Sequence, residues 1–362
     1  MGRTPGGGEL QIALLAKSLA LAGNDVVVID PGGKEDFVSA DGIKVVTVKG
    51  WDNGIWMLRT LTHRLPQFFR LLKKQNADIY YCRIRDFRHM LVYWAARKAK
   101  AKFILALASD LDILSFWMRC KHNYFTQRGD LWTLFSGFFI EIIYPFLLHK
   151  SDIVFTQHEG QKAILDKKSI SSIVNSNLID LAALHSVSDP VRKEFVYVGS
   201  LARRKGIVQF FELVQKCPHY KFKVIGQPRD RAGHFYYEKL KSIQNVTLLG
   251  RLNHSETIKH IANSKALIST SPMEGFPNIF IESWACGIPV LSLYVNPGSV
   301  IEKENLGYFA KGSIDDLIQK LSFYNTPNGI NKAAIAHVEK TYNLNQKKID
   351  DINLIFHKLI QN

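Results

Sequence analysis

The sequence contains little cysteine, and its cysteines form no motif. The 362 residues include four of them, which lie far apart, without a Cys-x-x-Cys pair or a histidine at metal-ligand spacing. A zinc site and a disulfide framework are therefore not expected, and a reducing compartment suits the chain. The first residues, MGRTPGGGEL, lack the apolar core of a secretory signal. We accordingly expect a cytoplasmic protein.

Flexible linkers, low-complexity segments and internal repeats are also missing. The hydrophobic fraction of 46% and the charged fraction of 22% are typical of a globular protein. Because a domain commonly holds about 100–200 residues, the chain is long enough for two domains, each with a core of its own.

The longest hydrophobic run falls short of a membrane span. Residues 131–148, LWTLFSGFFIEIIYPFLL, number eighteen, whereas a transmembrane helix needs about 20. Glu141 in the middle and Pro145 near the end also favour a buried core helix. A helix that dips into a membrane surface is the alternative, because aromatic and basic residues cluster around the start of the run: Trp117, Arg119, Lys121, Tyr124, Phe125, Arg128 and Trp132.

Acidic residues are too few to balance the basic ones, and the formal charge is +15. Residues 51–100 hold 11 Lys and Arg against 3 Asp and Glu, and residues 201–250 hold 10 against 3. Such basic windows suit phosphate-bearing ligands or an anionic membrane surface. We do not expect a nucleic-acid partner, because the chain has no recognised nucleic-acid motif and mixes aromatic with basic residues only in 116–132.

Short β-rich runs alternate with amphipathic segments, which indicates an α/β fold with parallel sheets covered by helices. Strands are expected at 25–30, 44–48, 77–83, 102–108, 152–157, 194–200, 220–226, 245–250, 266–271 and 288–293. The pattern restarts after a segment at 181–193 that is rich in turn formers. We predict two doubly wound, Rossmann-like domains, 1–185 and 186–345, and a C-terminal helix, 346–362, that packs back toward the first domain.

Two turns could hold a phosphate group. PGGGE (5–9) leads into a helix, where backbone N–H groups and the helix dipole favour an anion. YVGSLARRKG (197–206) leaves a strand at Gly199 and carries three consecutive cations, Arg203 to Lys205. Ligands of open α/β sheets bind at the carboxyl ends of strands. These cations are therefore placed to neutralise a diphosphate.

A third turn, MEGFPN (273–278), lies between an expected strand and an expected helix. This geometry places Glu274 at the mouth of the ligand crevice and Glu282 inside the helix. A carboxylate can accept hydrogen bonds from two neighbouring sugar hydroxyls. We therefore expect the two glutamates to bind hydroxyl groups.

The stretch EGFPNIFIESWACGIPVL (274–291) resembles the E-x7-E signature of retaining glycosyltransferases of family 4, the group 1 glycosyltransferases. VGSLARRKG resembles the basic donor-phosphate loop of this family, and PGGGE resembles its N-terminal glycine turn. VNSNLIDL (174–181) stands where the family commonly has Asn-Gly-Val-Asp, with Leu178 in place of the glycine. The resemblance spans nearly the whole chain and is strongest from 194 to 310.

The resemblance implies the GT-B fold, in which two Rossmann-like domains face each other and the second binds most of the nucleotide sugar. By motif position, Arg204 and Lys205 would bind the donor diphosphate and act in catalysis together with Glu274, which would bind the transferred sugar. Glu282 would bind the ribose hydroxyls. The resemblance implies further contacts with the nucleotide sugar. Backbone amides of the turn would contact the sugar, from Gly275, Phe276, Pro277 and Asn278. Arg251, Leu252 and Asn253 would border the base, and the remaining implied contacts are the glycines Gly199, Gly6 and Gly7.

Catalysis would then rest on cations and N–H dipoles that stabilise the departing nucleotide, without a metal or a cofactor. In enzymes of this kind the departing phosphate assists attack from the same face, and we assign no protein nucleophile. A UDP-sugar is the expected donor, because it is common among such enzymes. The expected acceptor is a glycan or a lipid-linked molecule of cell-surface polysaccharide or lipopolysaccharide synthesis. The enzyme would then be peripheral on the inner face of the plasma membrane.

The sequence departs from this family in two places. A strand normally precedes the glycine turn, whereas MGRT stands here. We expect a sequence that starts late, and the alternative is a first domain without its central strand, which would leave a hole in the sheet. Ser109-Asp110 stands where the family often has His-Asp, so Ser109 and Asp110 are weaker candidates for a sugar or acceptor contact.

Two other functions stay open. Asp110-Leu111-Asp112 has the form of the D-x-D motif that binds a divalent metal in GT-A transferases. Outside the enzymes, a non-catalytic protein could bind nucleic acid or a membrane through the two basic windows.

Overall fold

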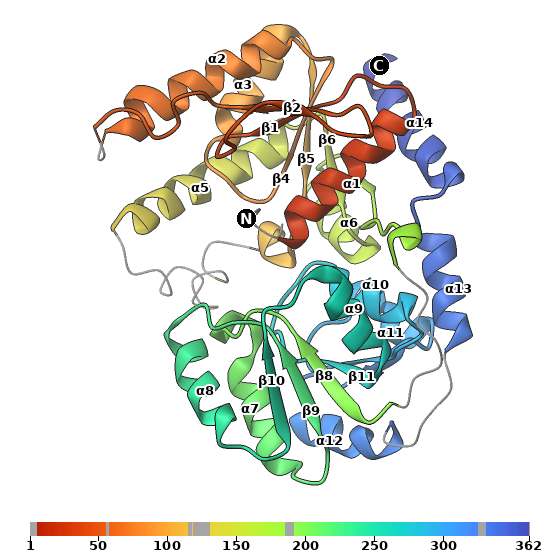
Figure 1. Ribbon diagram of the computed structural model, residues 1–362. Helices are drawn as coiled ribbons and strands as arrows, with labels where there is room; N and C mark the ends of the chain where they lie inside the picture. The colour runs from red at the N-terminus through yellow and green to blue at the C-terminus, as the bar shows by residue number, and fades with distance from the viewer. Residues whose placement is uncertain are drawn as a thin grey trace.

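The computed structural model describes residues 6–55, 58–114, 118, 131–184, 192–324 and 331–361, with the backbone alone for 131–138 and Ala183. The chain folds into two α/β halves that face each other (Figure 1). The predicted domain boundary at 185/186 lies outside the described residues, as do six of the seven aromatic and basic residues predicted to adjoin the hydrophobic run: Trp117, Arg119, Lys121, Tyr124, Phe125 and Arg128.

Seven strands of the first half form two sheets. One contains β1 (Val27–Asp30), β2 (Phe37–Val38) and β3 (Lys44–Thr47) in the order β1-β3-β2. The other contains β4 (Ile79–Arg83), β5 (Lys102–Ala106), β6 (Ile153–Thr156) and β7 (Ser172–Val174), all parallel. β1 and β4 are edge strands of their sheets, and among the described residues no strand joins them.

Helices cover both sides of these strands (Figure 1). On one side lie α2 (Leu65–Gln75), which continues from η1 (Thr60–Arg64), α3 (His89–Ala99) and α5 (Leu131–Lys150). On the other side α1 (Gly7–Leu21) packs against α14 (Gln346–Gln361). Shorter helical segments complete this half: η2 (Asp110–Ile113), α6 (Glu159–Asp166) and η3 (Leu181–Ala183).

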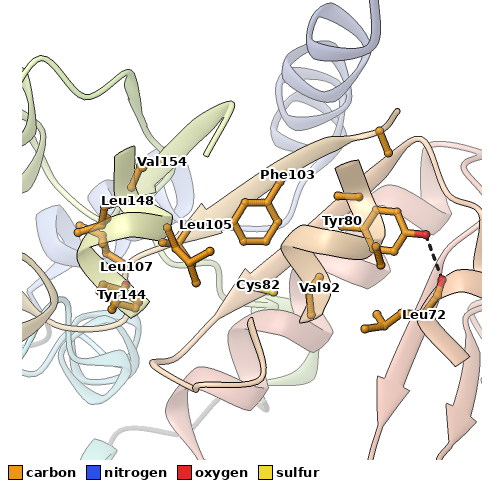
Figure 2. Packing of buried hydrophobic residues seen from close by; sticks show 14 of the residues in the cluster. Leu72, Tyr80, Cys82, Val92, Phe103, Leu105, Leu107, Tyr144, Leu148 and Val154 are labelled. Carbon is orange, nitrogen blue, oxygen red and sulfur yellow. Dashed lines mark hydrogen bonds between the residues drawn. The ribbon is translucent and has the colours of Figure 1, made fainter. Parts of the chain in front are cut away.

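The core of the first half forms between the four-stranded sheet and helices α2, α3 and α5. Figure 2 shows Phe103, Leu105 and Leu107 of the β5 region among side chains of the surrounding elements. Tyr80 on β4 is buried, and its hydroxyl donates a 3.0 Å hydrogen bond to the carbonyl of Leu72 on α2 (Figure 2). Such a bond lets a buried phenol keep a partner for its polar end.

Helix α5 has two different faces. Its inner face is buried and carries Tyr144 and Glu141, whose carboxylate accepts a 2.8 Å hydrogen bond from Arg85. Its outer face exposes Phe139, Ile142 and Phe146. The prediction of a core helix therefore describes the inner face alone. In the part of the chain that the structure describes, no helix is long and apolar enough to span a bilayer.

The second half contains one parallel sheet in the order β10-β9-β8-β11-β12-β13. Its strands are β8 (Glu194–Val198), β9 (Phe222–Ile225), β10 (Val246–Gly250), β11 (Ser264–Ser269), β12 (Val290–Ser292) and β13 (Gly307–Phe309). The covering segments are η4 (Arg203–Lys205), α7 (Ile207–Lys216), α8 (Arg231–Lys241), α9 (His254–Ala262), α10 (Asn278–Ala285), η5 (Pro297–Ser299), α11 (Val300–Lys303), α12 (Ile314–Phe323) and α13 (Lys332–Thr341). The strand order reverses between β8 and β11, so a ligand crevice is expected at their carboxyl ends.

All ten strands predicted from the sequence are present. The three that the prediction missed, β2, β7 and β13, have two or three residues each. Runs this short do not establish an alternating pattern, so hydrophobic periodicity could not reveal them.

Candidate active site

The basic turn after β8 meets the acidic turn after β11 at the predicted crevice. Lys205 Nζ and Glu274 Oε1 form an ion pair in which both side chains are largely buried. Lys205, Glu274 and Pro277 line one pocket together with Tyr197 and residues of β11. A ligand group that reaches this pocket could contact the cation and the carboxylate at once.

Gly206 brings the basic turn this close to β11. Its φ is +72°, a left-handed conformation that disfavours other residues. A Cβ there would stand 1.9 Å from the carbonyl oxygen of Thr270. Tyr197 supports the turn with a 3.1 Å hydrogen bond from its hydroxyl to the carbonyl of Lys205. Arg204 is exposed, so a flexible cation stands beside the fixed Lys205.

The turn that follows Glu274 lies against the first half. A Cβ on Gly275 would stand 1.8 Å from Gln157 Oε1 and 3.0 Å from the carbonyl oxygen of Ala108, so the turn packs closely against the first half. Phe276 turns its buried ring into the core beside Trp284. Among the described residues, the N–H groups of Gly275 and Phe276 have no hydrogen-bond partner. Pro277 has no N–H, so only Gly275, Phe276 and Asn278 can donate from the backbone of the predicted turn, and the predicted donor contact of Pro277 stays a prediction.

Asn278, predicted to contact the donor, uses its side chain to join the two halves. Its Nδ2 donates to the carbonyl of Gly7 at 3.0 Å. Its Oδ1 accepts from Gln11 at 3.1 Å and from Asn177 at 2.8 Å. Asn177 is 2% exposed and also donates to the carbonyl of Phe276 at 2.7 Å. Because the side chain of Asn278 is engaged in this way, its backbone N–H is the group that could contact a nucleotide sugar.

Gly6 and Gly7, expected to approach the diphosphate, lie at the start of α1. Gly6 is the N-cap, and its N–H donates to Glu9 Oε2 at 2.7 Å. Gly7 approaches the second half through its contact with Asn278. The glycine turn thus lies beside the turn that follows Glu274, and its predicted contact with the diphosphate stays a prediction.

Glu282, the predicted ribose clamp, is 8% exposed on α10. His254 Nε2 lies 3.2 Å from its Oε1. This hydrogen bond raises the pKa of His254 above its usual value. His254 was not among the predicted site residues, although it directly follows the predicted loop 251–253.

The other predicted donor contacts lie around this pair. Asn253 is the N-cap of α9, and its side-chain oxygen accepts from the N–H of Glu256 at 2.8 Å. Its own N–H donates to Glu256 Oε2 at 3.2 Å, and its carbonyl accepts from the N–H of Thr257 at 3.0 Å. Leu252 packs against the core, and Arg251 is exposed. Gly199 ends β8, where its N–H donates to the carbonyl of Ile225 at 2.9 Å.

The D-x-D triplet is divided between two environments. Asp112 is buried, and its Oδ2 accepts from the N–H groups of Ala108 at 2.7 Å and Ser109 at 2.9 Å. Burial raises the pKa of its carboxyl group. Asp110 lies instead beside His158, 3.1 Å away. Among the described residues, no group of three or more His, Cys, Asp or Glu side chains is arranged to hold a metal ion.

Residues 185–326 match the family model of glycosyl transferases group 1. This matched region, 142 of the 362 residues, is similar to group 1 glycosyltransferase domains. A glycosyltransferase of Methanocaldococcus jannaschii is 26% identical over 234 residues, which are 58% of this chain and 56% of that relative. A glycosyltransferase of Haemophilus influenzae is 22% identical over 329 residues, which are 87% of this chain and 86% of that relative. The predicted transferase class is confirmed for the domain.

A solved structure shares the architecture of the whole chain. Sucrose-phosphate synthase from Thermosynechococcus elongatus is similar with a TM-score of 0.75 and 16% identity, over 98% of this chain and 93% of that one. A likeness at this identity concerns the fold. It confirms the predicted GT-B arrangement, which places the glycosyltransferase domain opposite a second Rossmann-like half.

The pair of His254 and Glu282 in the transferase domain predicts a pH effect on stability. The pKa of His254 is raised in the folded state. The pair therefore stabilises the folded protein fully at a pH below the unfolded-state pKa of about 6.5, and it does so less as pH rises through the folded-state pKa. Above about pH 6.5, the unfolding midpoint of the wild type should therefore fall more steeply with rising pH than the midpoint of His254→Gln. Thermal unfolding from pH 5.5 to 9 tests this, with His219→Gln at an exposed histidine as control. Parallel curves for the wild type and His254→Gln would contradict it.

Proposed function

We propose that this protein is a retaining glycosyltransferase of family 4 that moves a sugar from a nucleotide-sugar donor to a glycan or lipid-linked acceptor. The observation that carries the proposal is the ion pair of Lys205 and Glu274 at the strand switch point. It joins the predicted phosphate-binding cation of the basic loop to the predicted sugar-binding carboxylate of the signature. A UDP-sugar is the proposed donor, following the enzymes that the sequence resembles.

The leaving group determines what the site must supply. Breakage of the bond between the sugar and the diphosphate leaves an anionic nucleotide and an oxocarbenium-like sugar. Lys205 and Arg204 would neutralise the diphosphate, and the amides of Gly275 and Phe276 would donate hydrogen bonds to the sugar phosphate. Lys205 also shields the diphosphate from the negative charge of Glu274, which stays available for a sugar hydroxyl.

No side chain is assigned as a nucleophile, so the proposed course is attack from the face that the nucleotide leaves. Proton NMR of the fresh product, which separates the two anomers, tests this course. An axial donor should give an axial product, whereas an equatorial product would contradict retention.

The proposed reaction needs no metal ion, because Lys205 and Arg204 would neutralise the diphosphate. This proposal stands against the alternative that Asp110 and Asp112 hold a divalent metal. Asp112 is committed to two backbone N–H groups, which weighs against that alternative. Full activity in EDTA is expected, and complete loss with rescue by manganese would contradict the proposal.

A donor screen tests the proposed binding site directly. Thermal unfolding with UDP-, GDP- and ADP-sugars should show a rise in midpoint for one base, because a ligand that binds the folded state stabilises it. Glu282→Gln should diminish this rise, and Glu238→Gln, at an exposed carboxylate paired with Lys241, should not. A screen in which no nucleotide sugar shifts the midpoint would count against the proposal.

We also propose that the outer face of α3 and α5 rests on an anionic membrane that carries the acceptor. Exposed apolar side chains on these helices are Trp94, Phe139, Ile142 and Phe146. Exposed cations on α2, α3 and the turn after α3 are Arg70, Lys73, Lys74, Arg97, Lys98 and Lys100. A face that joins apolar and basic groups suits an anionic lipid surface.

Liposome flotation tests the proposed membrane face. The wild type should float with vesicles containing phosphatidylglycerol at low salt and detach at high salt. The double variant Ile142→Glu and Phe146→Glu should bind about tenfold or more weakly, since burial of one such side chain is worth about 1.5–3 kcal/mol. Ile360→Glu, at an exposed position on α14, is the control. Equal flotation of all three proteins would contradict this docking face.

A further inference from the structure

His158 is a side chain to which neither the sequence nor the family match assigns a role. It is the N-cap of α6, directly after β6, and its Nε2 lies 3.1 Å from Asp110 Oδ1. Gln161, in the first turn of α6, donates to the same oxygen from its Nε2 at 2.8 Å. Two donors from one segment of the first half therefore hold one oxygen of the Asp110 carboxylate.

Asp110 is fixed where the two halves meet. Its backbone N–H donates to the carbonyl of Glu274 at 3.2 Å, so its carboxylate stands near the sugar-binding turn. The side chain is 38% exposed. Among the described residues, its Oδ2 has no hydrogen-bond partner. A carboxylate that is held by one oxygen in this way presents the other oxygen to a ligand.

The groups behind Asp110 are themselves held in place. Gln161 is fully buried, and its Oε1 accepts from the N–H of Gln157 at 2.7 Å. The side chain of His158 is 11% exposed and packs near Gly298 of the second half. Gln157 Oε1 in turn lies against Gly275. The residues that hold Asp110 are thus connected through Gln157 to the sugar-binding turn.

We infer that His158 and Gln161 are positioning residues that orient Asp110 to accept a hydrogen bond from a sugar hydroxyl. The inference rests on the proposed transferase function, and the hydroxyl belongs either to the transferred sugar or to the acceptor. His158 acts through Asp110, because its Nε2 is already engaged with that carboxylate. Orientation of this kind matters, since a displacement of about 1 Å at a reacting group can cost roughly 10²-fold in rate.

The test combines three variants with two kinds of acceptor. His158→Ala removes the donor, His158→Gln keeps an N–H that can reach Asp110, and Asp110→Asn removes the charge. Nucleotide release is measured from UDP-glucose, UDP-N-acetylglucosamine and GDP-mannose, with water alone or with octyl glucoside, octyl galactoside and octyl mannoside as probes. Release by the wild type is measured first, which separates failure of the proposed function from failure of this inference.

We expect His158→Ala to lower kcat/KM about 10–100-fold and His158→Gln to restore most of the loss. In the Asp110→Asn background, His158→Ala should add little, because the two residues act as one unit. If nucleotide release falls only in the presence of the octyl glycosides, the hydroxyl belongs to the acceptor. If release falls with water alone as well, the hydroxyl belongs to the transferred sugar.

Three results would overturn the inference: wild-type activity in His158→Ala, an equal loss in His158→Gln, or additive losses in the double variant. His219→Ala, at an exposed histidine after α7, controls for the loss of an imidazole elsewhere. Unfolding midpoints of the same samples separate a folding defect from misorientation.

Discussion

Replacement of Lys205 by methionine should lower kcat by about 10²–10³-fold, the usual effect of removing a group that stabilises charge in a transition state. Methionine retains much of the side-chain length but cannot neutralise the departing diphosphate. The change also leaves Glu274 without its cationic partner, so a carboxylate would repel the nucleotide. Steady-state kinetics with saturating donor measure the effect.

The matched control is Lys216→Met. Lys216 also forms ion pairs, with Glu212 and Asp315, but it lies at the end of α7 on the surface. This variant should keep kcat within about twofold of the wild type, as surface ion pairs contribute little. If Lys205→Met were as active as Lys216→Met, the basic turn would have no part in the chemistry.

Replacement of Glu282 by glutamine should raise the KM for the donor about 10–100-fold with little change in kcat. A hydrogen bond to a charged group is worth about 1.5–3 kcal/mol, and each 1.4 kcal/mol is about a tenfold change in affinity. The ribose does not react, so its contacts should be equal in the ground state and in the transition state. Initial rates over a range of donor concentrations measure both constants.

Glu238→Gln is the control for this prediction, because Glu238 is paired with Lys241 at an exposed site on α8. A fall in kcat with unchanged KM in Glu282→Gln would place Glu282 at the reacting sugar instead of the ribose. Such a result would exchange the roles proposed for the two glutamates of the signature.

Much of the fold follows from local patterns in the sequence. The strands of the second half are continuous apolar runs followed by glycine or polar turns, as in VYVG at the end of β8. Two glutamates at a fixed spacing around a Gly-Phe-Pro-Asn turn also sufficed to place Glu274 near Lys205, because the strand order brings both turns to one edge of the sheet.

The contacts between the halves could not be read from the sequence. Asn278 reaches Gln11 and Asn177, which are separated from it by 267 and 101 positions. Within the first half, His158 and Asp110 also lie 48 positions apart. Amides and histidines are common polar residues, and no local pattern shows which of them meet. His254 is different, since it is adjacent to a loop that the sequence did single out.

The most direct test of the account is release of the nucleoside diphosphate from a panel of UDP-, GDP- and ADP-sugars by the wild type, Glu274→Ala and Lys205→Ala. We predict that the wild type releases the nucleotide from at least one donor and that both variants lose this activity at least about 10²-fold. Undiminished release by both variants would show that the chemistry takes place elsewhere, and it would contradict the assignment of the active site to the turns after β8 and β11.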